Sequence, residues 1–131
     1  MFSEKEVAYL ISQRLARIAT VSSSMHPDVS PVGFEFDGKR FIISGHNIER
    51  TQKYRNVKNG NTKVALVVDD LESITPWTPR AVKVHGTAQV DELDGRAVLV
   101  IRPDSHWSWG VEAPPFEGGR QAIRKVVHDR S

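Results

Sequence analysis

The chain has 131 residues, of which 39% are hydrophobic, and it carries a formal net charge of +2. This length predicts one domain with a single core, and the lack of cysteine excludes disulfides, thiolate metal sites and a cysteine nucleophile. The charge is too small to indicate nucleic acid, and no apolar run approaches the roughly 20 residues of a membrane helix. We therefore expect a cytoplasmic protein without nucleic-acid or membrane partners.

The first half of the chain contains both helix and strand signals. Ser3 and Glu6 have capping-box spacing ahead of apolar residues at helical intervals. Pro31 interrupts an apolar run, which suits an edge strand, a bulge or a strand that opens onto a ligand. Asn47 is a candidate N-cap for a second helix. The predicted elements are a helix over 4–14, strands over 18–21, 29–36 and 40–44, and a helix over 48–58.

The second half is dominated by β-branched runs that are separated by turn residues. Its predicted elements are strands over 63–68, 81–90, 97–101 and 106–111, a loop over 69–80, and a final helix over 120–129. Many short strands with few helices are typical of a closed or partly closed β-barrel. No composition shift or linker divides the chain, so we expect a single domain over residues 1–131.

The segment after the strand over 40–44 is the best candidate for a functional site. The chain passes through Gly45 into a basic helix start, where Arg50 and Lys53 stand three residues apart and share a face. Thr51 adds a hydroxyl donor. Free N–H groups at a helix start attract anions, and arginine, lysine and a hydroxyl together suit a phosphate monoester. A solvated basic helix face is the alternative interpretation.

The order of motifs along the chain resembles that of the pyridoxamine 5'-phosphate oxidase-like split-barrel superfamily, and in particular its branch that uses the deazaflavin coenzyme F420. The matching stretches are residues 15–21, 26–34, 45–46, 49–55, 64–70, 76–77, 84–88 and 108–110. The resemblance implies a mainly β fold, a six- to seven-stranded antiparallel split barrel of the FMN-binding type that forms a homodimer. The N-terminal helix would lie in residues 1–14, the barrel in 15–111 and a tail in 112–131.

The resemblance also implies a set of cofactor-binding residues. Thr51 and Lys53 occupy the family's hydroxyl-x-lysine positions and would hold the cofactor phosphate, while the strand from Ser30 to Gly33 would face the ring. Flavin oxidases carry an arginine where this chain has Ser30, which favours deazaflavin over flavin mononucleotide. The candidates are Ser30, Pro31, Val32, Gly33, Gly45, His46, Arg50, Thr51, Lys53, Tyr54, Trp77 and Arg80.

For several aromatic and charged residues, the sequence allows either a structural role or a ligand-binding role. Trp77, between two prolines, either caps the barrel or stacks on a ring or substrate, and Arg80 either meets an acidic coenzyme tail or is simply solvated. Trp107 and Trp109 share one strand face, where core or interface packing is favoured. The histidines have no metal-like spacing, so no metal site is predicted.

The main functional hypothesis is a reductase that transfers a hydride from reduced coenzyme F420 to a small organic acceptor. The cofactor would supply the difficult chemistry, so the sequence need not show a catalytic side chain and none is identified. One alternative is an oxidoreductase that uses flavin mononucleotide. A second alternative, from another class, is a flavin- or deazaflavin-binding protein without turnover. The family's segment that binds pyridoxal phosphate has no counterpart, so vitamin B6 oxidation is not expected.

Overall fold

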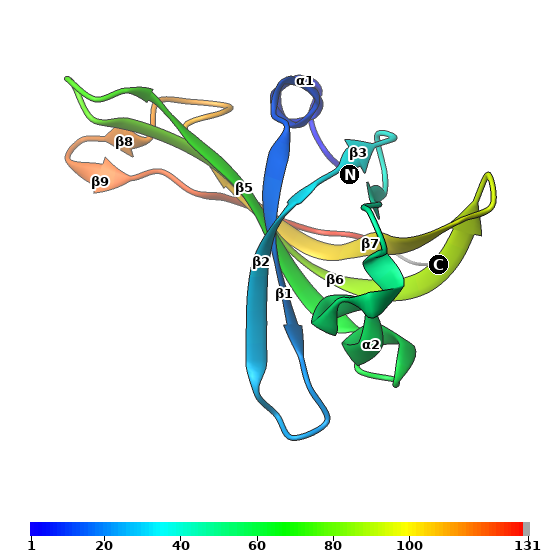
Figure 1. The fold of residues 1–131 in the computed structure, drawn as a ribbon. Coiled ribbons are helices and arrows are strands. Elements are labelled where there is room, and N and C mark those ends of the chain that lie inside the picture. The colour runs from blue at the N-terminus through cyan, green and yellow to red at the C-terminus, as the bar shows by residue number, and fades with distance from the viewer. Residues whose placement is uncertain (130–131) are drawn as a thin grey trace.

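The structure is a computed structural model that describes residues 1–129, and it is mainly β (Figure 1). Its helical elements are α1 (Glu4–Ser12), the 3-10 turn η1 (Ile48–Arg50) and α2 (Gln52–Lys58). Its strands are β1 (Leu15–Val21), β2 (Pro27–Gly33), β3 (Glu35–Phe36), β4 (Phe41–Ile43), β5 (Lys63–Ser73), β6 (Thr78–Leu93), β7 (Arg96–Trp109), β8 (Phe116–Glu117), β9 (Arg120–Gln121) and β10 (Arg124–Val127). No helix in this range is long and apolar enough to cross a membrane.

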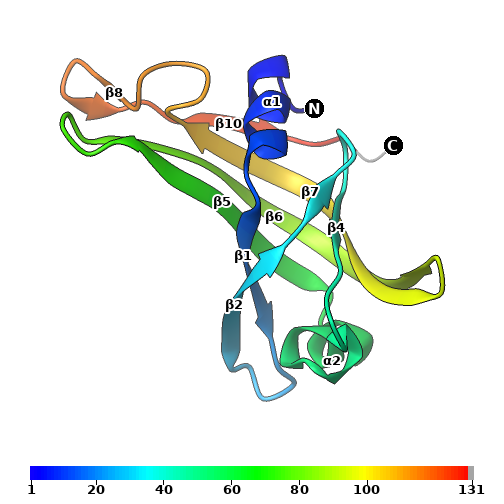
Figure 2. The same ribbon diagram turned by 45° about the horizontal axis from the view of Figure 1, so that its top comes forward.

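The main sheet is antiparallel and curls into part of a barrel. Its strands follow the order β2-β1-β5-β6-β7-β4-β3, and β10 adds to β7 beside this path. The two strands at the ends of the path, β2 and β3, are separated in sequence by Phe34 alone, so the chain itself holds the two ends of the sheet together. Figure 2 shows this curl, with α1 and α2 at opposite ends of β1. The prediction of a mainly β antiparallel split barrel is confirmed.

The first helix forms where the sequence predicted it. The Ser3 side chain accepts a hydrogen bond from the Glu6 backbone N–H at 3.1 Å, and the Ser3 N–H donates to Glu6 Oε1 at 2.9 Å. This reciprocal pair is a complete capping box, which satisfies two backbone donors that the helix cannot. The helix ends at Ser12 and buries Tyr9 and Leu10 against the sheet.

The core lies on the concave face of the curled sheet. Ile18, Leu66, Val84 and His106 face one another in register across β1, β5, β6 and β7, and each is at most 1% exposed. Burying an aliphatic side chain of this size contributes about 1.5–3 kcal/mol. The one polar member of this row, His106, is therefore unusual, and its partners are described below.

Three sequence predictions about the second half were wrong. The loop predicted over residues 69–80 is mostly strand, because β5 continues to Ser73 and β6 begins at Thr78. Pro76 lies in the turn of this long hairpin, and Pro79 lies on β6 opposite Leu71. The two strands predicted over 97–101 and 106–111 are the single strand β7. A register shift opposite Gly86 accommodates Pro103 without ending the ladder.

The final helix predicted over 120–129 is also wrong, since β9 and β10 occupy this region. Residues Arg124 to Val127 pair with Ser108 to Ser105 of β7, so the edge of the sheet supplies the backbone partners that a helix would have supplied internally. Two adjacent valines in this segment agree with a strand.

Candidate functional site

The helix predicted over residues 48–58 is interrupted at Thr51, and this changes how the site is built. Asn47 stands at the N-cap position of η1 with a φ of 51°, but its side chain makes no capping hydrogen bond. Thr51 caps α2 instead. Its Oγ1 donates to the Ile48 carbonyl at 2.6 Å and accepts from the Tyr54 N–H at 3.4 Å. The hydroxyl proton is thus already engaged within the loop.

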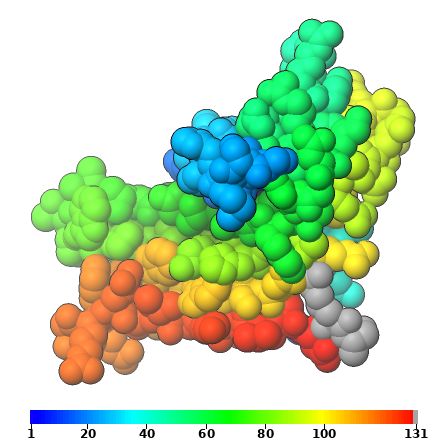
Figure 3. Space-filling view, turned by 90° about the horizontal axis from the view of Figure 1, so that it is seen from below, coloured from blue at the N-terminus to red at the C-terminus, as the bar shows by residue number. Residues whose placement is uncertain are grey.

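A cavity of about 200 Å³ lies between the end of β2 and the start of α2. Its lining residues are Pro31, Val32, Gly33, Ser44, Gly45, His46, Ile48, Thr51 and Lys53. The structure therefore brings together most of the predicted cofactor residues, which come from the separate segments 31–33 and 44–53. Figure 3 shows the β1–β2 hairpin, in blue, beside α2, in green.

Two glycines in this cavity have no explanation within the protein. A Cβ at Gly33 or Gly45 would meet no atom within 4 Å, and neither residue has a positive φ. Glycine weakens a strand and costs conformational entropy, so it is expected where a turn, a close backbone approach or a ligand requires it. Since neither a turn conformation nor packing requires these two, the space that their side chains would fill is available to a ligand.

Lys53 supplies the positive charge of the cavity. Its ammonium makes no ion pair with another residue in the described range 1–129. Arg50 is exposed and does not line the cavity. The cavity thus offers the ammonium of Lys53 and the exposed backbone of two glycines to a phosphate, and the apolar side chain of Val32 to a planar ring. Together these groups fit a phosphorylated planar ring.

A second cavity, of about 970 Å³, lies on the other side of the segment Ser44–Gly45–His46, which lines both. Tyr54, predicted as a cofactor residue, lines this larger cavity and not the smaller one, and it is 9% exposed. The larger cavity also exposes the carboxylates of Glu49, Asp91 and Glu92. Three carboxylates and the guanidinium of Arg96 thus line the larger cavity, while Lys53 lines the smaller one.

Two linked side-chain hydrogen bonds hold α2 against the sheet, and no sequence motif predicts them. Asn56 is 2% exposed and donates from Nδ2 to Thr20 Oγ1 of β1 at 2.9 Å. Gln52 Nε2 donates in turn to Asn56 Oδ1 at 2.6 Å. A buried amide without a hydrogen-bond partner lowers stability, so these two hydrogen bonds favour one position of α2 relative to the sheet. Lys53 lies on α2 and is positioned with it.

Besides Arg50 and Tyr54, three more of the predicted residues do not line the smaller cavity. Ser30 does not line it, and its Oγ is buried with no hydrogen-bond partner in residues 1–129. Trp77 is 57% exposed at the tip of the β5–β6 hairpin. Arg80 donates to both carboxylate oxygens of Asp70 at 3.0 and 2.6 Å, and this guanidinium lowers the pKa of Asp70. The side chain of Arg80 is thus committed to an ion pair within the protein.

The tryptophans of β7 are not core residues. Trp107 is half-buried and packs between the ammonium groups of Lys83 and Lys125, which lie 4.5 and 5.5 Å from its ring centroid. The three residues are cross-strand neighbours in register on β6, β7 and β10. Cation–π contacts of this kind stabilise an exposed aromatic ring by about 0.5–1 kcal/mol each.

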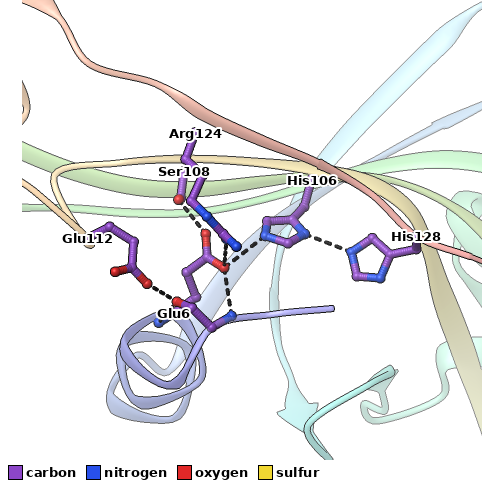
Figure 4. Close-up of polar contacts among 7 residues, drawn as sticks. Glu6, His106, Ser108, Glu112, Arg124 and His128 are labelled. Atoms are coloured by element: carbon purple, nitrogen blue, oxygen red, sulfur yellow. Dashed lines mark hydrogen bonds and ion pairs between the residues drawn. The ribbon is translucent and has the colours of Figure 1, made fainter.

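The buried carboxylate of Glu6 links α1 to β7 and β10, at the end of β1 opposite α2 (Figure 4). Glu6 is fully buried and accepts hydrogen bonds from Ser108 Oγ and Arg124 Nη1. His106 Nε2 lies 2.9 Å from Glu6 Oε1, and His106 Nδ1 lies 2.7 Å from His128 Nε2. Burial alone would raise the pKa of Glu6, but these hydrogen bonds outweigh it and hold the pKa well below its ordinary value.

Comparisons with known proteins agree with this fold. Residues 2–124 match the pyridoxamine 5'-phosphate oxidase family. A 5a,11a-dehydrotetracycline/5a,11a-dehydrooxytetracycline reductase of Streptomyces rimosus is 39% identical over 121 residues, which are 85% of this chain and 84% of the relative. A conserved hypothetical protein of Mycobacterium tuberculosis has a similar structure, with a TM-score of 0.68, 18% identity and coverage of 91% of this chain and 93% of that one. The structure of an F420 reductase is also similar, with a TM-score of 0.62 and 22% identity, and the match covers 81% of this chain and 98% of that one. At these identities the two solved structures support the fold alone.

Proposed function

The chain belongs to the pyridoxamine 5'-phosphate oxidase family, and we propose that it is an oxidoreductase that uses the deazaflavin coenzyme F420 to reduce a small organic acceptor. The observation that carries this proposal is the cavity in which Gly33 and Gly45 leave open space next to the free ammonium of Lys53. The reductase of Streptomyces rimosus, which acts on a dehydrotetracycline, supports a multi-ring acceptor of related chemistry.

The residues of the cavity have distinct proposed roles. Lys53 would hold the coenzyme phosphate, Val32 would pack against the ring, and the backbone at Gly33 and Gly45 would approach it closely. When bound in its reduced form, the coenzyme supplies a hydride. Ser30 supports deazaflavin over flavin mononucleotide, because this position offers no cation to a flavin phosphate.

We propose in addition that the protein acts as a homodimer whose second copy completes the cofactor site. The cavity within one chain measures about 200 Å³, which is below the roughly 300–1,000 Å³ of typical cofactor pockets. Trp77 is a candidate for this role, since it is exposed at the tip of a hairpin and does not line the cavity of its own chain. Light scattering that shows a monomer at micromolar concentration with saturating coenzyme would contradict the dimer.

Fluorescence titration of the purified protein with coenzyme F420 and, separately, with flavin mononucleotide tests the proposed function. We expect the deazaflavin to bind more tightly. Lys53→Ala should weaken that binding by about 1.5–3 kcal/mol, the loss of a charge-assisted hydrogen bond, which is roughly a 10- to 150-fold rise in Kd. Lys58→Ala is the matched control, since Lys58 is exposed on the same helix and lines neither cavity.

Each result of the titration has a definite meaning. Binding of flavin mononucleotide alone would replace the deazaflavin with a flavin. Equal affinity in Lys53→Ala and the parent would place the phosphate elsewhere. Reduced coenzyme that binds but transfers no hydride to any of a panel of enones, imines and quinones would support the non-catalytic alternative.

A further inference from the structure

The reduction of a polarised double bond needs a proton as well as a hydride, and the proposed function leaves the proton donor unassigned. This inference rests on that function. A side chain that gives the proton must reach the acceptor, and it must carry a transferable proton near neutral pH. Such a group should border both the cofactor cavity and the larger cavity beside it.

His46 borders both cavities and carries an imidazole. It lies in the segment Ser44–Gly45–His46, which lines the cavity of about 200 Å³ on one side and that of about 970 Å³ on the other. Its side chain is exposed, and its imidazole makes no hydrogen bond or ion pair with another residue in the described range. Both ring nitrogens are thus available to a ligand. Imidazole is the side chain whose protonation normally changes between pH 5 and 8.

The neighbouring groups are less suited to this step. Those that line the two cavities are Glu49 of η1, Lys53 and Tyr54 of α2, Asp91 and Glu92 of β6, and Arg96 of β7. Solvated carboxylates have ordinarily lost their protons at neutral pH, and a guanidinium does not release one. A phenol ordinarily keeps its proton to about pH 10, so it is a weaker acid than an imidazolium. Tyr54 is the strongest rival, because its side chain reaches the larger cavity.

We propose that the His46 imidazolium is the general acid that completes reduction of an acceptor bound in the larger cavity. Hydride addition to one atom of the acceptor double bond leaves an electron pair on the neighbouring atom. A ring N–H bond of His46 breaks, and its proton forms a new bond at that atom. The neutral imidazole then takes a proton from water, so the protein returns to its starting state with one hydride and one proton transferred.

The test compares His46→Gln with Tyr54→Phe and with His26→Gln, a control on an exposed histidine in the β1–β2 hairpin that lines neither cavity. The acceptor is the compound that the parent protein reduces fastest in the panel above. In His46→Gln we expect kcat to fall by about 10²–10⁴-fold, the usual contribution of a general acid. The decline of kcat with rising pH that the parent shows should disappear in this variant.

A second readout does not depend on turnover. The imidazole proton resonances of His46, assigned by their loss in His46→Gln, should shift when the reduced product of the acceptor is added to the protein loaded with oxidised deazaflavin. The resonances of His26 should not shift. Tyr54→Phe should keep the alkaline decline of kcat that the parent shows.

The outcomes separate this inference from the function on which it rests. A parent protein that does not bind deazaflavin, or binds it without turnover, overturns both. A parent that turns over while His46→Gln keeps its rate and its pH profile overturns the inference alone. Loss of the alkaline decline in Tyr54→Phe instead of His46→Gln assigns the proton to Tyr54 and likewise overturns it.

Discussion

Gly45→Ala should weaken cofactor binding and stabilise the fold at the same time. The backbone of Gly45 has no positive φ and a Cβ there meets no protein atom within 4 Å, so alanine fits without strain. Restricting the unfolded chain should then raise the free energy of unfolding by about 0.4–1 kcal/mol. The added methyl group takes space in the proposed binding site. Overpacking costs about 1–3 kcal/mol, so we expect the Kd for deazaflavin to rise roughly 5- to 150-fold.

The two effects are measured on the same preparation, by fluorescence titration for Kd and by urea denaturation for the free energy of unfolding. Gly60→Ala is the control, since Gly60 has a φ of +109°, lies just after α2 and lines neither cavity. This control should lose about 1 kcal/mol of stability and keep its affinity. Parental affinity in Gly45→Ala would refute the assignment of the open space to a ligand. A loss of stability would refute the claim that glycine is not needed there by the backbone.

Two further predictions concern the buried cluster at the chain ends. Glu6→Gln should lower the free energy of unfolding by about 3–5 kcal/mol, measured in urea, because it removes the charge that Arg124 and His106 face; a loss below about 1 kcal/mol would contradict this. Burial lowers the pKa of His128 from 6.5 to about 4, so the unfolded chain takes up a proton first as pH falls. Stability should therefore decrease between pH 6.5 and pH 4, and His128→Gln should flatten that decrease; equal slopes in the two proteins would contradict it.

The fold was predictable where local signals agree with the tertiary structure. The capping box at Ser3 and Glu6 and the β-branched run of β5 each specify their element through nearby residues. The end of the chain was not predictable in this way. Residues 124–127 become a strand because the edge of β7 offers backbone partners, and those partners lie nearly 20 residues away in sequence. Pro103 likewise does not end a strand, because a register shift that depends on the neighbouring strand accommodates it.

The cavity was predictable as a set of residues but not as a set of contacts. The sequence identified Lys53 and the strand through Val32, and the structure brings them to one cavity. No sequence pattern predicts the buried role of Asn56, since a single asparagine in a short helix has no distinctive spacing. Burial of its amide against Thr20 is a consequence of how α2 packs on β1. The commitment of Arg80 to Asp70 was hidden for the same reason, because the two residues pair across a hairpin that was read as a loop.

The position of Ser30 sharpens what the chain can offer to a phosphate. Ser30 and Val32 alternate with Pro31 and therefore face the same side of β2, where Val32 lines the cavity and Ser30 does not. An arginine at position 30 has the length to extend along this face toward the cavity, whereas a serine hydroxyl does not. The Thr51 hydroxyl proton is already donated to the Ile48 carbonyl, and among the described residues Lys53 is the one lysine or arginine that lines this cavity. A phosphate bound there must depend on Lys53, on backbone N–H groups and on cations from outside the cavity of one chain, which is why a single lysine substitution is a decisive test.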